Sequence, residues 1–174
     1  EAECTAVGLT VLAAEHGDFA VVRPPGHHAK AERADGFCLF NNIAIAAQKL
    51  VSEGKKVFIL DIDGHHGDGT QEIFYESDQV LFCSVHQQYA YPGTGYSHET
   101  GEGPGKGYTM NFPLPAGSGD RELLEVVDRA IARAEEFKPD VVGVSAGFDG
   151  YIDDRLLELR YTLNGYFQVG NKLA

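Results

Sequence analysis

The chain has 174 residues, which fits one domain, and its 43% hydrophobic and 23% charged residues are ordinary for a globular protein. Its formal net charge of −12 argues against direct binding to nucleic acid, because phosphate-binding proteins usually carry a basic surface; it would suit cationic partners. No run of about 18 apolar residues and no signal sequence is apparent. We therefore expect no membrane segment. Because the three cysteines are widely spaced, we also expect no disulfides and a reducing, cytoplasmic location.

Apolar patterns along the chain predict alternating helices and strands. The chain opens on a helical stretch, and amphipathic patterns predict helices at 39–53, closed by Gly54, and at 120–137, with Asp120 as a good N-cap. A long glycine-rich segment, 92–107, is expected to line an active site. Strands are predicted at 19–23, 57–63, 80–86, 108–114 and 141–146. This order indicates an α/β fold, a three-layer sandwich in which helices flank a parallel sheet.

The densest group of potential metal ligands is the segment 61–69, Asp-Ile-Asp-Gly-His-His-Gly-Asp-Gly. It follows the apolar run 57–60, and ligand sites in open α/β sheets gather at the carboxyl ends of strands. Oxygen and nitrogen donors at this density indicate a divalent metal. Zinc suits them best, although ferrous iron or cobalt would accept similar ligands. The alternative is an acidic, solvated loop that carries two histidines.

A pair of adjacent histidines, His27 and His28, follows the apolar run 19–22 and an Arg-Pro-Pro-Gly turn. The turn frees both imidazoles to face one cavity, where they could act as general base and general acid. Taken alone, the pair is more typical of a surface turn. A third segment, 145–150, places Asp149 just past another predicted strand. Three strand ends that carry carboxylate or imidazole groups favour a common site.

Five ordered motifs resemble the zinc-dependent histone deacetylase family and its prokaryotic relatives, among them the acetylpolyamine amidohydrolases. The likeness spans about residues 19–170 and implies an arginase/deacetylase-like fold over one catalytic domain. The family carries further sequence at both ends, so we expect residues 1–174 to be a truncated form of this domain. The motifs are Arg-Pro-Pro-Gly-His-His-Ala (23–29), Gly-Phe-Cys-Leu-Phe-Asn-Asn (36–42), the run 61–69, Tyr-Pro-Gly-Thr-Gly (91–95) and Ser-Ala-Gly-Phe-Asp (145–149).

The resemblance implies a role for each matching residue. Asp63, His65 and Asp149 fall on the family's zinc ligands, a set that leaves positions open for water and substrate. His27 and His28 fall on its paired catalytic histidines. The other matches are Asp61 and Asp68, which orient those histidines, and Gly36, Phe37 and Tyr91, which bind substrate along the acyl-lysine channel.

Some neighbouring positions need separate interpretation. The family usually has phenylalanine where this chain has Tyr91, so the second channel wall carries a hydroxyl group that needs a partner. Ser84, with Asp61, matches a monovalent-cation site and implies a potassium ion beside the zinc. We expect His66 to have a structural, hydrogen-bonded role. His86 is expected in the core, while His98 and Glu99 are expected in solvent.

The implied activity is zinc-dependent hydrolysis that removes acetyl groups from N-acetyl-lysine side chains of a protein or peptide. A metal-activated water would attack the amide while the histidine pair transfers protons. The first alternative is a deacetylase of acetylpolyamines or other small amides. The second is a metal-binding module without activity, because the family's oxyanion-stabilising tyrosine follows a strand that would come after Ala174. A binuclear, arginase-like hydrolase is disfavoured by the single-metal ligand set.

Overall fold

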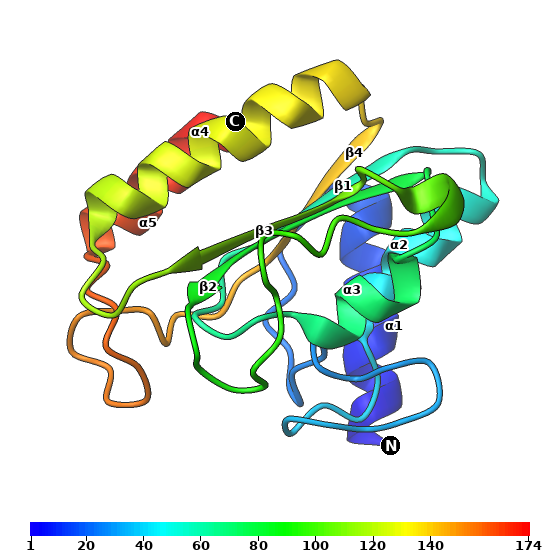
Figure 1. Ribbon diagram of the computed structural model, residues 1–174. Coiled ribbons are helices and arrows are strands. Elements are labelled where there is room, and N and C mark those ends of the chain that lie inside the picture. Colours follow the sequence, from blue (N-terminus) through cyan, green and yellow to red (C-terminus); the bar gives the residue numbers. More distant parts are fainter.

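A four-stranded parallel sheet forms the centre of the computed structural model, which describes all 174 residues. The predicted three-layer α/β sandwich is confirmed, with α1, α2 and α3 on one face of the sheet and α4 and α5 on the other (Figure 1). No helix has the length and apolar character needed to cross a membrane. The elements are α1 (Ala2–His16), α2 (Asn42–Ser52), β1 (Val57–Asp61), α3 (Asp68–Phe74), β2 (Val80–Gln87), the 3-10 turn η1 (Gly103–Gly105), β3 (Thr109–Leu114), α4 (Asp120–Phe137), β4 (Val141–Ser145) and α5 (Leu163–Leu173).

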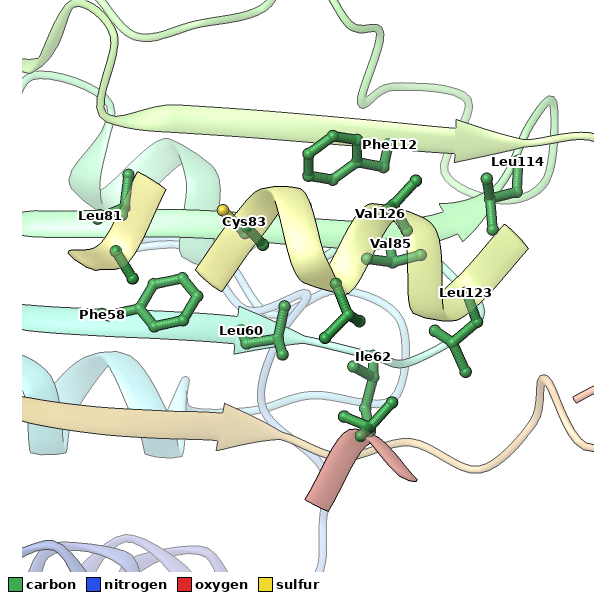
Figure 2. Packing of buried hydrophobic residues seen from close by; sticks show 14 of the residues in the cluster. Phe58, Leu60, Ile62, Leu81, Cys83, Val85, Phe112, Leu114, Leu123 and Val126 are labelled. Carbon is green, nitrogen blue, oxygen red and sulfur yellow. The ribbon is translucent and has the colours of Figure 1, made fainter. Parts of the chain in front are cut away.

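Alternate residues of the central strands supply a hydrophobic core on each face of the sheet. The strands lie in the order β3-β2-β1-β4, so β1 and β2 are central and buried along nearly their whole length. Burial on both faces explains why these strands read as continuous apolar runs. Figure 2 shows the larger core, where Phe58 and Leu60 pack with Leu123 and Val126 of α4. The core on the opposite face consists of Ala44, Ala47, Leu50, Val57, Ile59, Phe74, Val80 and Phe82.

The predicted bounds of α4 are confirmed, but Asp120 is not its N-cap. The N-cap is Gly119, whose backbone N–H donates a 2.9 Å hydrogen bond to the carboxylate of Glu122. Asp120 instead accepts hydrogen bonds from the backbone N–H of Thr162, at 2.7 Å, and from its hydroxyl group, at 2.6 Å. Since Thr162 is the N-cap of α5, this carboxylate ties the starts of the two helices together.

The strand predicted at 19–23 is wrong. No backbone hydrogen bond joins this segment to a strand, and Phe19 and Val21 are 75% and 87% exposed. An apolar run becomes a strand only where a neighbouring strand supplies hydrogen-bond partners. The sequence pattern shows the apolar run but does not show whether a neighbouring strand is available to pair with it.

Two helices near the site also differ from the prediction. The helix expected at 39–53 is shorter, because the side chain of Asn41 caps α2 and accepts a 3.1 Å hydrogen bond from the backbone N–H of Ala44. Helix α3 was not predicted. It has only seven residues, too few to show helical periodicity, and includes Gly69 near its start.

The outer edge of β4 is unpaired, because β1 occupies its other side. Val142 and Val144 are 46% and 40% exposed there. A groove runs along this strand, lined by β4 on one side and by α1, α2 and the segment 18–22 on the other. The carboxyl end of the groove opens at Asp63 and Gly147, close to the candidate site described below.

Tyr161 is a fully buried side chain whose hydroxyl group has no hydrogen-bond partner. Replacing it with phenylalanine keeps the ring and removes a buried, unsatisfied polar group. We therefore expect Y161F to raise the free energy of unfolding by about 1 kcal/mol. Urea denaturation followed by far-ultraviolet circular dichroism checks this. The control Y96F, at an exposed tyrosine, should leave the free energy unchanged; a destabilised Y161F would contradict the prediction.

Candidate active site

The candidate site is assembled at the carboxyl ends of the parallel strands. In the sheet register, Asp61 of β1 lies beside Ser84 of β2 and Ser145 of β4. The chain therefore leaves neighbouring strands at one edge of the sheet, and in Figure 1 the loops that follow β2 and β4 extend from the same side. This arrangement brings the turn after β1 against the turn after β4.

The three predicted metal ligands, Asp63, His65 and Asp149, lie together. Each offers one ligand atom, and these atoms all fall within 4.8 Å of one another. His65 Nδ1 lies 2.5 Å from Asp149 Oδ2 and 3.3 Å from Asp63 Oδ1. The group is only partly buried, so a metal bound there would be open to a small molecule.

Backbone groups hold the carboxylates of the predicted ligands, Asp63 and Asp149, in place. The N–H of His65 donates to Asp63 Oδ1 at 2.8 Å, and the N–H of Gly64 donates to Asp149 Oδ1 at 2.7 Å. Gly147 must remain a glycine, since a Cβ atom there would lie 1.8 Å from Asp63 Oδ2. The turn after β4 therefore reaches the turn after β1 only because residue 147 has no side chain.

Both catalytic candidates, His27 and His28, are buried and hydrogen-bonded to the carboxylates expected for them. His27 Nδ1 donates to Asp61 Oδ2 at 2.9 Å, and His28 Nδ1 donates to Asp68 Oδ1 at 2.7 Å. The ring centroids of the two histidines are 4.0 Å apart. Because both Nδ1 atoms are engaged, Nε2 is the atom that each ring has free for proton transfer. For His27 this atom lies 3.8 Å from Asp63 Oδ2, next to the predicted metal ligands.

The acids and bases of the site shift one another's pKa values. Burial lowers the pKa of His27, but the charge and hydrogen bond of Asp61 outweigh burial and raise it to about 9. Burial raises the pKa of the Asp61 carboxyl group, against the effect of His27. Burial also acts to raise the pKa of Asp63, yet hydrogen bonding and charge from His65 and His27 bring it to about 2. Asp63 is therefore ionised at neutral pH, as a metal ligand must be.

Lys30 belongs to the site and was not singled out from the sequence. Its Nζ lies 3.1 Å from Asp68 Oδ2 and 3.4 Å from Glu72. Burial acts to raise the pKa of Asp68, but the hydrogen bonds from His28 and Lys30 lower it, so this carboxylate stays charged beside His28. The only signal in the sequence is the position of Lys30, two residues after the histidine pair.

The substrate-binding candidates lie around His28. A Cβ atom on Gly36 would lie 2.3 Å from His28 Cδ2, so the backbone packs directly against this ring. Phe37 is 94% exposed and has a positive φ of 65°. The ring centroid of Tyr91 lies 5.1 Å from that of His28 and 6.4 Å from that of His65. The two aromatic residues thus lie on the solvent side of the histidines.

The glycine-rich segment after β2 is held by a polar network, so the expectation that Glu99 is solvated is wrong. Glu99 accepts hydrogen bonds from Gln71 Nε2, at 2.6 Å, and from the backbone N–H groups of Gly95 and Tyr96. His66 has the expected structural role, with Nδ1 2.8 Å from Thr94 Oγ1 and Nε2 3.0 Å from Gln71 Oε1. The network fixes the segment that follows Tyr91.

His86 is buried, as expected, and connects the network to the sheet. Its Nδ1 lies 2.9 Å from Ser84 Oγ, and its Nε2 lies 3.0 Å from the carbonyl oxygen of Gly95. Burial lowers the pKa of His86 to about 3, so the ring is neutral at physiological pH. The Ser84 side chain, adjacent to Asp61, is therefore already engaged with His86.

The chain is similar in sequence to several known proteins. Residues 1–174 match the family model described as "Histone deacetylase domain". A "Probable deacetylase" of Archaeoglobus fulgidus is 50% identical over 153 residues, 87% of this chain and 43% of that protein. "Histone deacetylase 10, chloroplastic" of Oryza sativa is 46% identical over 158 residues, 89% of this chain and 36% of that protein. The chain thus spans less than half the length of these two relatives.

A solved structure agrees closely with the fold. The crystal structure of an acetylpolyamine aminohydrolase from Burkholderia pseudomallei superposes with a TM-score of 0.92 at 40% identity. The match covers 98% of this chain and 52% of that one. The sheet and its flanking helices therefore have the arrangement seen in that structure.

Proposed function

The chain belongs to the histone deacetylase family, and from this premise we propose that it hydrolyses acetyl groups from N-acetyl-lysine side chains with zinc as its metal. Relatives named as deacetylases and acetylpolyamine amidohydrolases support an acetylated amine as the substrate class. One observation carries the proposal. The cluster of Asp63, His65 and Asp149 lies next to a pair of buried histidines, each bonded to its own carboxylate.

The donor set fits zinc. One imidazole and two carboxylates, partly open to solvent, are typical of a catalytic zinc site with a free position, although ferrous iron or cobalt would also fit. When bound, zinc would polarise the acetyl carbonyl group and lower the pKa of a water molecule towards about 7. We also propose a potassium ion beside Asp61 and Ser84, which are paired neighbours in β1 and β2.

The two histidines would divide the proton transfers between them. His27 has its Nε2 beside Asp63. Bound zinc would offset the charge of the neighbouring carboxylates and lower the pKa of His27 below its metal-free value, so that Nε2 could take a proton from the attacking water. Asp61 holds its Nδ1 and stabilises the imidazolium that forms. His28 lies against Tyr91 on the solvent side, and is placed to donate a proton to the leaving amine. Asp68, itself paired with Lys30, holds His28 in the matching orientation.

A deacetylase of acetylpolyamines is the second candidate. The 40% identity and the TM-score of 0.92 to an acetylpolyamine aminohydrolase favour it. The net charge of −12 is also compatible with a polycationic substrate. Both candidates use the same chemistry and differ in what lies beyond the scissile amide. A metal-binding module without activity of its own is the third candidate.

The proposed function is tested with the zinc-loaded chain, an acetyl-lysine peptide and N-acetylspermidine, each with and without a chelator. We expect turnover that the chelator abolishes and added zinc restores. Faster turnover of the peptide supports the lysine deacetylase, and faster turnover of N-acetylspermidine supports the second candidate. A folded, zinc-loaded chain that cleaves neither substrate would contradict both and leave the metal-binding module.

We keep the cytoplasm as the proposed location. Cys4, Cys38 and Cys83 are all free thiols, as is usual in a reducing compartment. The chloroplastic rice relative supplies the alternative location. Fractionation of cells that produce the tagged protein would separate the two.

A further inference from the structure

A single hydrogen bond joins two loops on the solvent side of the histidines. The hydroxyl group of Tyr91 donates to Asp35 Oδ1 at 2.5 Å. Tyr91 follows β2, whereas Asp35 lies in the segment between the histidine pair and α2, 56 residues earlier in the chain. The hydroxyl group that distinguishes Tyr91 from phenylalanine therefore has a defined partner.

Asp35 opens the tight turn that presents Phe37. The backbone N–H of Asp35 donates to the carbonyl oxygen of Cys38, and the N–H of Cys38 donates back to that of Asp35, at 3.1 and 2.7 Å. Gly36 and Phe37, the two central residues, have φ values of 51° and 65°, as in a type I′ turn. The Asp35 carboxylate also accepts a 2.9 Å hydrogen bond from the N–H of Gly36. Asp35 thus holds the turn and Tyr91 at once.

The hydrogen bond between Tyr91 and Asp35 links the Tyr91 ring to the turn that carries Phe37. The turn is packed on the ring of His28 through Gly36, and the Tyr91 ring meets the same histidine edge-on at 5.1 Å. A side chain as exposed as Tyr91 would otherwise change rotamers freely. The hydrogen bond to Asp35 restricts this rotation and favours the position of the Tyr91 ring beside His28.

We propose that Asp35 is a positioning residue, which fixes the Tyr91 ring through its hydroxyl group and so sets the width of the channel between Tyr91 and Phe37. This inference rests on the proposed function, because it assigns the channel an unbranched alkyl chain next to the acylated amine. A Tyr91 ring that is already fixed loses little further freedom when such a chain binds beside it. In this proposal Asp35 acts by accepting the hydrogen bond of the Tyr91 hydroxyl group, and its negative charge is not required.

A rival role for Asp35 is the recognition of a positive charge on the substrate. Arg33 Nη2 lies 3.6 Å from the second carboxylate oxygen and offsets part of its charge. The two roles predict different behaviour of D35N, which keeps an oxygen acceptor for the Tyr91 hydroxyl group but removes the charge. D35A removes both.

The test compares D35N, D35A, Y91F and D35A/Y91F with the wild-type chain on an acetyl-lysine peptide. We expect D35A and Y91F each to raise KM by about five- to tenfold with kcat nearly unchanged, because the wall contacts the alkyl chain equally in ground and transition states. The double variant should be no worse than D35A, which also loses the hydrogen bond to the N–H of Gly36, and D35N should stay within about twofold of wild type. E32A is the matched control, since Glu32 is an exposed carboxylate in the same segment without a hydrogen bond or ion pair.

A binding measurement keeps the inference testable without turnover. Octanoyl hydroxamate would bind the zinc-loaded chain with its alkyl chain between the walls, whereas acetohydroxamate is too short to reach them. We expect D35A and Y91F to raise the Kd of the long ligand by the same five- to tenfold factor, about the effect of one lost hydrogen bond, and to leave the short ligand unchanged. If the wild-type chain cleaves no substrate, the proposed function fails while this comparison still decides the role of Asp35.

Three results would overturn the inference. Additive losses in D35A/Y91F would mean that the two residues act independently. A D35N variant as weak as D35A would assign the effect to charge. Nuclear magnetic resonance of [13Cζ]-tyrosine adds a test that needs no metal, because the bond to Asp35 raises the pKa of Tyr91 to about 12. A wild-type Tyr91 that titrates at the ordinary value of about 10, as we expect only in D35A, would show that the bond is absent in solution.

Discussion

Replacing Asp149 with alanine is expected to abolish stoichiometric zinc binding by the chain. Its Oδ2 atom lies 2.5 Å from His65 Nδ1, and its other oxygen is held by the backbone N–H of Gly64. Only Asp63 and His65 would remain, and two ligands are too few for a zinc site in a protein. Because the loss of an outer hydrogen-bond partner already costs about 10- to 100-fold in metal affinity, the loss of a ligand should cost more than about 100-fold.

Zinc content after dialysis, measured by atomic emission, and titration calorimetry check this prediction. The matched control is D153A, which removes an exposed aspartate four residues later on the same loop and should keep one zinc per chain. Circular dichroism must show both variants folded. One zinc per chain in folded D149A would mean that Asp149 is not a ligand.

Replacing His28 with alanine should, unlike the Asp149 substitution, leave zinc binding intact and abolish most turnover. The ring of His28 lies beside the ligand cluster but its Nδ1 is bound to Asp68, and none of its atoms belongs to the cluster. Removal of a general acid or base typically costs about 10²- to 10⁴-fold, and we expect kcat to fall within that range. Steady-state kinetics on the acetyl-lysine peptide, together with zinc content, measure both quantities.

H98A is the control for this variant, since His98 is an exposed histidine stacked on Tyr96. It should match the wild-type chain in kcat and in zinc content. Zinc lost from H28A would identify His28 as a ligand in place of a proton donor. Full activity in H28A would remove it from the mechanism.

Much of the architecture follows from local patterns in the sequence. The α4 helix has a clear apolar stripe of 3.6-residue period over 18 residues, so its bounds could be predicted. The strands β1 and β2 are buried on both faces and appear as unbroken apolar runs. The ligand candidates could be grouped because the carboxyl ends of parallel strands share one edge of a sheet.

What the sequence could not supply are contacts made between distant segments. The run 19–23 is as apolar as a strand, but no neighbouring strand lies within hydrogen-bond reach. Glu99 was expected in solvent and Lys30 was not singled out. Only the folded chain shows that Glu99 holds Gln71 and that Lys30 holds Asp68. The partner of the Tyr91 hydroxyl group lies 56 residues away, a separation that no local pattern reports.

The unpaired edge of β4 predicts that the isolated chain aggregates in concentrated solution. Its Val-Val-Gly-Val sequence contains no charge and no proline, which are two of the features that protect strand edges in natural proteins. An extended segment of a neighbouring molecule can therefore add to the sheet there, and additions that are not two-fold symmetric do not close into a defined oligomer. When the chain is concentrated, precipitation should therefore begin at this edge. Val142→Lys places a charge on the edge and should keep the chain in solution at the concentrations that the measurements above require.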